Sequence, residues 1–185
     1  MARADDNPEL VRLVRAMSQF YRICLSQGKD VIPLGEELRF TDSYMTIQNI
    51  RYAGIIHYSA DVPEPLLGIL IPKITIQPLV ENCVLHGLKS EAKSFHVRVT
   101  GRVEEEGRAV ITVQDDGNGM SEASIEALNA SLREGGEQIG FGVRNVHQRI
   151  VLLFGEGYGL RYQKSKSGGV AVEIRLPKEE VERDV

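Results

Sequence analysis

Several common features are missing from this 185-residue sequence: it has no tryptophan, only two cysteines and no long hydrophobic run. An apolar stretch from Pro65 to Pro72, between Glu64 and Lys73, is far shorter than the ~20 residues that a membrane-spanning helix needs. We therefore expect no membrane-inserted segment within it. Cys24 and Cys83 fall in helical patterns without paired or metal-binding spacing, which indicates reduced thiols of an intracellular protein.

The sequence also lacks an excess of positive charge. Its formal net charge of -4 argues against a broad basic face, so we expect no nucleic-acid partner. A bound polyphosphate would need local cations, because the protein as a whole repels it. Zinc-like His/Cys spacing, a Ser-His-Asp elbow, G-x-G-x-x-G and G-x-x-x-x-G-K-[ST] are all missing, which disfavours zinc, hydrolase, Rossmann and P-loop sites.

What is present suits a globular protein with one core and a helical annex, since 42% of the residues are hydrophobic and 26% are charged. Apolar residues at helical spacing predict a hairpin of helices over about 9–26 and 34–51. Glu36 and Glu37 lie in the first turn of the second helix, where the helix dipole favours them. We divide the chain into a helical region at 1–52, an α/β domain at 53–177 and a frayed tail at 178–185.

The larger part of the chain alternates between strand and helix patterns. Strands are predicted at 55–59, 95–101, 109–113, 159–163 and 170–176. Helices are predicted over 74–87, 122–132 and 142–153, with a proline-rich connection at 62–72 and a mobile polar segment at 133–138. The strands would form one layer and the helices another.

Three polar or glycine-rich patches carry the functional signal. The first, Asp115-Asp116-Gly117-Asn118-Gly119-Met120, directly follows a predicted strand. Its glycines allow a tight turn with exposed backbone N–H groups, and the Asp115 carboxylate could accept a hydrogen bond from an exocyclic amine such as that of adenine. The alternative is an ordinary β-turn or a calcium-type loop, because Asp, Asn and Gly dominate turns.

The second patch, Gly140-Phe141-Gly142-Val143-Arg144-Asn145, opens a predicted helix. A glycine-rich loop that leads into a helix N-terminus is a natural anion site, and Arg144 in the first turn could reach a phosphate. The alternative is a hinge followed by an ordinary helix cap.

The third patch lies on the helix predicted to begin near Ile74. Asn82 and His86 are four residues apart and would share one face, with Glu81 beside Asn82. An amide oxygen is a hard ligand suited to Mg²⁺, which usually keeps waters and binds phosphates as well. The alternative is a buried structural asparagine. The order of all three patches, rather than any one of them, indicates a nucleotide site.

Together the patches resemble a known family. The run from Pro78 to Gly87 looks like the asparagine box of sensor histidine kinases, Asp115-x-Gly117-x-Gly119 like their first glycine box, and Gly140-x-Gly142-Val143-x-Asn145 like their second. Three further motifs resemble the LytS/YesM-type kinases: Leu38-x5-Tyr44-x3-Gln48-x2-Arg51-Tyr52, Ile71-Pro72-x4-Gln77-Pro78-Leu79-Val80-Glu81-Asn82 and Arg149-Ile150-x3-Phe154-Gly155. The resemblance covers about residues 9–177. It makes 1–52 a helical remnant of the family's dimerisation and phosphotransfer region and 53–177 the ATP-binding domain.

The resemblance implies an α+β fold of the Bergerat (GHKL) type, a two-layer α/β sandwich in which helices cover one face of a mixed sheet, preceded by the helical hairpin. It places Asp115 on the adenine amine, Asn82 on Mg²⁺ through the ATP phosphates, and Arg133–Ile139 in a lid. The implied ATP-binding residues are Asn82, His86, Asp115, Gly117, Gly119, Met120, Gly140, Gly142, Val143, Arg144 and Asn145, with Glu81 as a candidate catalytic residue.

The resemblance also implies a function: the cytoplasmic catalytic segment of a bacterial two-component sensor, whose parent is a homodimer anchored in the inner or plasma membrane. It would transfer the ATP γ-phosphoryl group to a histidine on an upstream helix, for relay to a response regulator. The family's phosphoacceptor motif is absent from the sequence, so we expect ATP binding without self-phosphorylation. Two positions depart from the family: Leu85 stands where Lys is common, and Val170 where Thr is usual.

Two alternatives remain open. In a degenerate nucleotide-binding or interaction module, Leu85 and Val170 would be signs of lost activity. A free-standing GHKL ATPase or serine kinase would need a base, for which Glu81 is the candidate, although the N-terminal hairpin argues against it.

Overall fold

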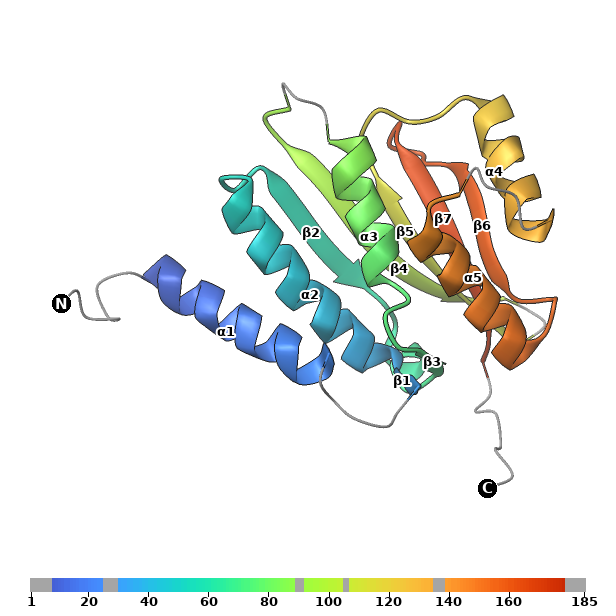
Figure 1. Ribbon diagram of the computed structural model, residues 1–185, viewed down its shortest axis with the longest axis horizontal. Coiled ribbons are helices and arrows are strands. Elements are labelled where there is room, and N and C mark those ends of the chain that lie inside the picture. The colour runs from blue at the N-terminus through green and yellow to red at the C-terminus, as the bar shows by residue number, and fades with distance from the viewer. Residues whose placement is uncertain (1–7, 25–29, 89–91, 105–106, 135–138, 179–185) are drawn as a thin grey trace.

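A five-stranded mixed sheet forms the centre of the molecule (Figure 1). The computed structural model describes residues 8–24, 30–88, 92–104, 107–134 and 139–178. In spatial order the strands are β2 (Ile56–Asp61), β4 (Phe95–Val103), β5 (Arg108–Asp115), β7 (Val170–Pro177) and β6 (Gly159–Lys164). β2 runs parallel to β4, and all other neighbours are antiparallel.

Helices lie over one face of this sheet, which confirms the predicted two-layer α+β sandwich (Figure 1). They are α2 (Leu34–Arg51), α3 (Gln77–Asn82) and α5 (Phe141–Phe154), while α4 (Glu122–Glu134) packs beside β6. α1 (Pro8–Cys24) packs along α2 and forms the predicted hairpin with it. A short 3-10 turn, η2 (Glu64–Leu66), lies between β2 and β3 (Leu70–Pro72). None of the described helices is long and apolar enough to cross a membrane.

Strand alternation builds the core between the two layers. In β4, Phe95, Val97 and Val99 are buried, whereas the intervening His96 and Arg98 are exposed. The side chains that α3 and α5 add to the same core are Leu79, Val80, Val143, Val146 and Ile150.

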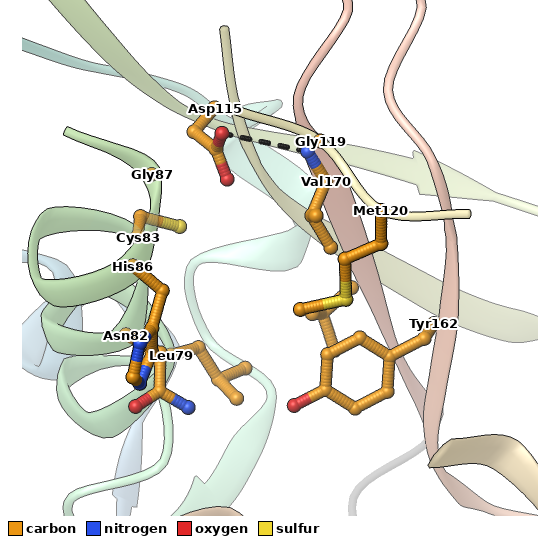
Figure 2. A pocket seen from close by; sticks show the side chains of 11 residues that line it. Leu79, Asn82, Cys83, His86, Gly87, Asp115, Gly119, Met120, Tyr162 and Val170 are labelled. Atoms are coloured by element: carbon orange, nitrogen blue, oxygen red, sulfur yellow. Dashed lines mark hydrogen bonds between the residues drawn. The ribbon is translucent and has the colours of Figure 1, made fainter. Parts of the chain in front are cut away.

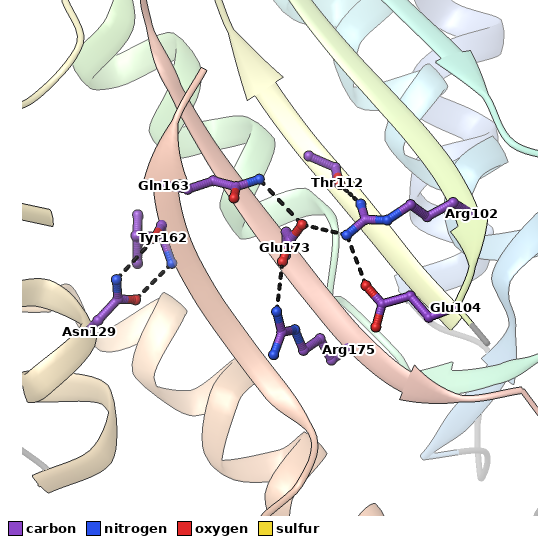
Figure 3. A network of polar contacts seen from close by, with 8 residues as sticks. All are labelled: Arg102, Glu104, Thr112, Asn129, Tyr162, Gln163, Glu173 and Arg175. Carbon is purple, nitrogen blue, oxygen red and sulfur yellow. Dashed lines mark hydrogen bonds and ion pairs between the residues drawn. The ribbon is translucent and has the colours of Figure 1, made fainter. Parts of the chain in front are cut away.

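Polar side chains hold the outer face of the sheet (Figure 3). The Glu173 carboxylate, only 5% exposed, accepts hydrogen bonds from Arg102 of β4 at 2.7 Å, Arg175 of β7 at 3.2 Å and Gln163 of β6 at 3.3 Å. Burial acts to raise the pKa of Glu173, but the two arginines outweigh it and the pKa is lowered. One buried carboxylate thus connects strands on both sides of β5.

The structure corrects three predicted elements. Residues outside the predicted strands form a short antiparallel ribbon of β1 (Val31–Pro33) and β3, because three residues give too little alternation to detect. The helix predicted over 74–87 begins at Gln77 and, after Asn82, gives way to a π-turn, η3 (Cys83–Gly87), which residue types alone do not reveal. Of the segment predicted to be mobile, 133–134 belong to α4, and 135–138 lie outside the described residues.

The turn that leads into α3 is held from two sides. Its residue Ile74 has a left-handed backbone (φ 61°), which is unusual for a β-branched residue. The Glu37 carboxylate of α2, fully buried, accepts hydrogen bonds from the backbone N–H groups of Ile74 (3.0 Å), Thr75 (2.8 Å) and Ile76 (2.9 Å). Burial raises the pKa of Glu37, and these N–H groups act in the opposite direction.

The second support of this turn comes from α5. The Arg149 guanidinium donates to the carbonyl oxygens of Lys73 at 2.6 Å and Ile74 at 3.0 Å. The position of Glu37 in the first turn of α2 is as predicted, but its main contact is with a segment 37 to 39 residues away in the sequence. The hairpin, α3 and α5 are therefore joined at one turn.

We expect Glu37→Gln to lower the free energy of unfolding by about 1–3 kcal/mol, because the amide has one acceptor oxygen and its NH₂ group opposes the remaining N–H donors. Urea denaturation would measure the change. Glu36→Gln, at the neighbouring half-buried position, is the matched control. Equal stability of the two variants would show that the Glu37 contacts contribute little.

Candidate functional site

A pocket lies between the end of α3 and the strands β5, β6 and β7 (Figure 2). Five predicted site residues line it: Asn82, His86, Asp115, Gly119 and Met120. The other lining residues are Leu79, Cys83, Gly87, Tyr162, Val170 and Val172. The pocket therefore combines mainly apolar walls with a few polar groups, as small-molecule sites commonly do.

Asp115 is the buried acid of this pocket, with only 3% of its surface exposed. Its Oδ1 accepts a hydrogen bond from the backbone N–H of Gly117 at 2.8 Å and a longer one from that of Val170 at 3.4 Å (Figure 2). The buried Cys83 thiol lines the same pocket. Burial raises the pKa of Asp115, and its hydrogen bonds act to lower it. Both backbone bonds use one oxygen, so the main chain leaves the second oxygen available for a ligand.

Glycines allow the main chain to approach Asp115 this closely. A Cβ atom on Gly169 would overlap Oδ1 of Asp115, and one on Gly87 would lie 3.0 Å from the same atom. A Cβ atom on Gly117 would overlap the carbonyl oxygen of Gly87. The first glycine patch therefore packs the main chain around a carboxylate, which an ordinary exposed β-turn would not require.

Asn82 and His86 reach the pocket from α3 and its π-turn rather than from the continuous α-helix predicted. Single π-turns occur frequently at functional sites. Asn118 stabilises this π-turn through two hydrogen bonds. Its Nδ2 donates to the carbonyl oxygen of His86 at 3.1 Å, and its backbone N–H donates to the carbonyl oxygen of Gly87 at 3.2 Å. The asparagine patch and the first glycine patch are thus one structural unit.

The other predicted site residues lie outside the lining, and they are Glu81, Gly117, Gly140, Gly142, Val143, Arg144 and Asn145. α5 begins directly after Gly140, and a Cβ atom on Gly142 would lie 3.6 Å from the Cβ of Pro78. The second glycine patch therefore lies against the start of α3. The Val143 side chain is buried in the core, so only its main chain could face a ligand.

Sequence reasoning did not select Tyr162, Val170 and Val172 for the ligand set, although all three line the pocket. Val170 and Val172 are two residues apart on β7 and therefore lie on the same face of the sheet. Strand periodicity does not show which strand lies next to β5. The residues that form this wall of the pocket could therefore not be predicted without the sheet order.

The metal-binding capacity of the pocket is limited. Among the residues that the structure describes, no group of three or more His, Cys, Asp or Glu side chains is placed to hold a metal ion. The side-chain amide oxygen of Asn82 fits a hard cation that arrives with most of its ligands, as Mg²⁺ does with phosphates and water.

We expect Gly117→Ala to lower the free energy of unfolding by about 1–3 kcal/mol, because the added methyl group overlaps the main chain of Gly87 rather than a movable side chain. Thermal and urea unfolding would measure the loss. In Gly68→Ala, the control, the new methyl group has no neighbour within 4 Å, so stability should change little. A fully stable Gly117→Ala would contradict the packing described here.

The sequence is similar to that of known proteins. The family model described as histidine kinase-, DNA gyrase B- and HSP90-like ATPase matches residues 72–180, and a histidine kinase model matches residues 1–56. Sensor histidine kinase YesM of Bacillus subtilis (strain 168) is 30% identical over 177 residues, which cover 96% of this chain and 29% of the relative. Sensor protein LytS of Oceanobacillus iheyensis is 32% identical over 164 residues, with 87% and 28% covered. The chain spans about three tenths of these relatives' length.

Solved structures share the fold. One is the histidine kinase domain of the blue-light activated histidine kinase from Erythrobacter litoralis EL346, with a TM-score of 0.55, 22% identity and coverage of 92% of this chain and 75% of that one. Another is the ATP-binding domain of PrrB from Mycobacterium tuberculosis, with a TM-score of 0.55, 19% identity and coverage of 80% and 98%. Because the first family model spans more than half of the sequence, this chain belongs to the histidine kinase-, DNA gyrase B- and HSP90-like ATPases.

Proposed function

We propose that this chain is the ATP-binding catalytic segment of a two-component sensor histidine kinase. The observation that carries the proposal is Asp115, a buried carboxylate that lines an apolar pocket and whose Oδ1 alone is bonded to the main chain. An ionised carboxylate only accepts hydrogen bonds, so it would accept from the exocyclic amine of adenine. Guanine presents a carbonyl oxygen at the corresponding position, which the carboxylate would repel. Leu79, Met120 and Val172 would pack against the base.

Asn82 would hold Mg²⁺ through the oxygen of its side-chain amide. When bound, Mg²⁺ would neutralise charge on the phosphates. Gly140 and Gly142 would lie against the phosphates at the N-terminus of α5, where the first N–H groups of a helix have no helical partner, and the Arg144 side chain would reach a phosphate. Glu81, half-buried beside Asn82, is the candidate base, and residues 133–139 would form the lid, of which 135–138 lie outside the described residues.

The acceptor of the γ-phosphoryl group would be a histidine of the parent protein outside this sequence, reached through the helical region at 1–52. A response regulator would then take the phosphoryl group. The proposed parent is a membrane-anchored sensor, and this segment would lie on its cytoplasmic side. The support is the pair of family models, one on each part of the chain, together with the names of the relatives.

We expect calorimetric titration with Mg-ADP to show binding to the wild type and about 10- to 100-fold weaker binding to Asp115→Asn. The substitution replaces an acceptor by an amide donor that opposes the adenine amine. Asp116→Asn is the matched control, because the Asp116 carboxylate bonds the backbone N–H and Nδ1 of His96 at 2.8 and 2.7 Å and does not line the pocket.

The outcomes separate the three functions under consideration. A folded wild-type chain that binds no Mg-ADP would indicate a degenerate interaction module. Steady ATP hydrolysis by the isolated chain would favour a free-standing ATPase. Nucleotide binding without hydrolysis and without transfer of radiolabel from ATP to the chain itself would agree with a kinase segment whose acceptor lies elsewhere.

We further propose that the parent protein is a homodimer that uses α1. Exposed apolar side chains recur on this helix at intervals of four, three and four residues: Leu10, Val14, Met17 and Tyr21, exposed by 40–55%. This spacing places them along one stripe, as in helix–helix interfaces. The side of α1 that packs on α2 is separate from this stripe, since Ala16 is buried.

We expect Val14→Glu to shift the sedimentation of the chain toward the monomer, because a charge in the stripe must be desolvated in the dimer. Arg15→Glu introduces the same side chain at an exposed position off the stripe and should leave the sedimentation unchanged. Monomeric wild type at high concentration would contradict dimerisation through this segment alone.

A further inference from the structure

His147 is a titratable side chain of α5 that neither the motifs nor the proposed function uses. It is half-buried where α5 packs against β6 (Figure 1). The backbone N–H of Leu160 on β6 donates to Nδ1 of His147 at 3.0 Å. Because a backbone N–H can only donate, Nδ1 must offer a free electron pair, and the proton of the neutral ring is on Nε2. The neutral side chain thus joins α5 to the start of β6.

The main chain at the start of β6 lies directly against the imidazole ring. Gly159 has a φ of 127°, which residues with a side chain rarely adopt. A Cβ atom at this position would lie 2.7 Å from both Cε1 and Nδ1 of His147, closer than real contacts allow. The glycine therefore permits the close approach of strand and ring that the hydrogen bond requires.

The strand that His147 holds is also a wall of the pocket. Tyr162 lines the pocket, and its backbone N–H and carbonyl group both bond the Asn129 side chain of α4 (Figure 3). The N–H groups of Leu160 and Tyr162 point to the same side of β6, since the two residues are two positions apart. Side chains of two helices thus hold this strand, and of the two only His147 can change its charge.

The charges around His147 nearly cancel. Its side chain lines a surface groove with six other titratable or charged side chains, which are Glu126 and Arg133 of α4, Glu156 and Tyr158 of the turn after α5, Arg161 of β6 and Arg175 of β7. Arg175 is bonded to Glu173, which leaves two arginines facing two glutamates. Burial then dominates, and it lowers the pKa of His147 below its ordinary value of about 6.5.

Protonation reverses the role of Nδ1. An imidazolium ring carries a hydrogen on both nitrogens and accepts no hydrogen bond, so its Nδ1–H would oppose the N–H of Leu160. Leu160 is only 7% exposed, and its N–H would be left without an acceptor. A buried donor without a partner destabilises the arrangement that buries it. Separation of the strand from α5 would relieve both effects.

We propose that His147 is a pH-sensitive anchor of β6: the neutral ring holds the strand on α5, and protonation releases the start of the strand and loosens the pocket wall at Tyr162. The unfolded chain takes up this proton more readily than the folded one. The stabilisation is therefore complete above about pH 6.5 and is lost as the pH falls. Only the effect of the anchor on nucleotide binding rests on the proposed function.

The first test reads the bond in the wild-type chain without a ligand. The backbone ¹H–¹⁵N signal of Leu160 should shift between pH 7.5 and 5 with the same midpoint as the ring signals of His147. His147→Asn keeps a side-chain acceptor near the position of Nδ1 and does not titrate, so the Leu160 signal should lose this pH dependence. A wild-type Leu160 signal that does not follow the His147 ring would overturn the inference, even if the variant failed to fold.

Urea denaturation gives the second readout. From pH 7.5 to 5.5, the unfolding constant of the wild type should rise about 3- to 10-fold relative to that of His147→Asn, because uptake of one full proton on unfolding changes it about tenfold per pH unit. His57→Asn, at an exposed position of β2 on the opposite edge of the sheet, is the control, and its ratio to the wild type should stay constant. A merely structural histidine would give the same ratio for His147→Asn at every pH, which would also overturn the inference.

Titration with Mg-ADP connects the anchor with the proposed function. From pH 7.5 to 5.5, binding to the wild type should weaken about 3- to 10-fold more than binding to His147→Asn, and the titration of the nucleotide itself cancels in this comparison. If the chain binds no nucleotide while the Leu160 signal follows the His147 ring, the proposed function fails and the anchor stands. If Mg-ADP binds with a ratio of affinities that is independent of pH, the coupling of His147 to the pocket is wrong.

Discussion

The buried carboxylate of Glu37 is the contact on which the arrangement of this molecule depends. It fixes three consecutive backbone N–H groups in the turn before α3, while Arg149 fixes two carbonyl oxygens at the start of the same turn. The turn sets the direction of α3 and therefore the place of Asn82. An isolated helix of six residues would not be stable in water. The geometry of α3 therefore comes from the contacts of Glu37 and Arg149 with the turn. The same contacts connect the N-terminal hairpin to the segment that carries the pocket.

The pocket itself follows from one demand, the burial of Asp115 beside the main chain. Glycines are required where the chain passes the carboxylate, and the backbone of Val170 supplies one of the hydrogen bonds. Because the N–H group makes that contact, a valine can provide it as well as a threonine. Valine instead of the family's usual threonine at position 170 removes a hydroxyl group from the pocket but leaves the hydrogen bond to the Asp115 carboxylate in place. A raised pKa is the expected cost of keeping this acid in an apolar wall.

The sequence predicted the layers, most strands and the three functional patches, since long periodic runs and glycine-rich turns are local signals. It gave no sign of the partners of Glu37, because residues 37 and 74–76 meet only in the folded chain. The π-turn was also hidden, since its residues suit an α-helix equally well. Tyr162 stayed out of the predicted site because its place in the pocket wall depends on the sheet order, in which β6 follows β7 at the edge. Local pattern thus selected five of the residues that line the pocket, and non-local packing decided which residues complete its walls.

The side-chain amide of Asn129 on α4 donates to the carbonyl oxygen of Tyr162 at 2.9 Å and accepts from its backbone N–H at 2.8 Å (Figure 3). This pair of bonds has a consequence for association between molecules. β6 is an edge strand, and the unpaired backbone groups of such an edge can template pairing with a strand of another chain. By satisfying both groups of Tyr162 near the middle of β6, the Asn129 amide interrupts that row. A second strand could add there only after α4 had moved away. The side chain of one helix thereby protects the sheet from growing into an aggregate.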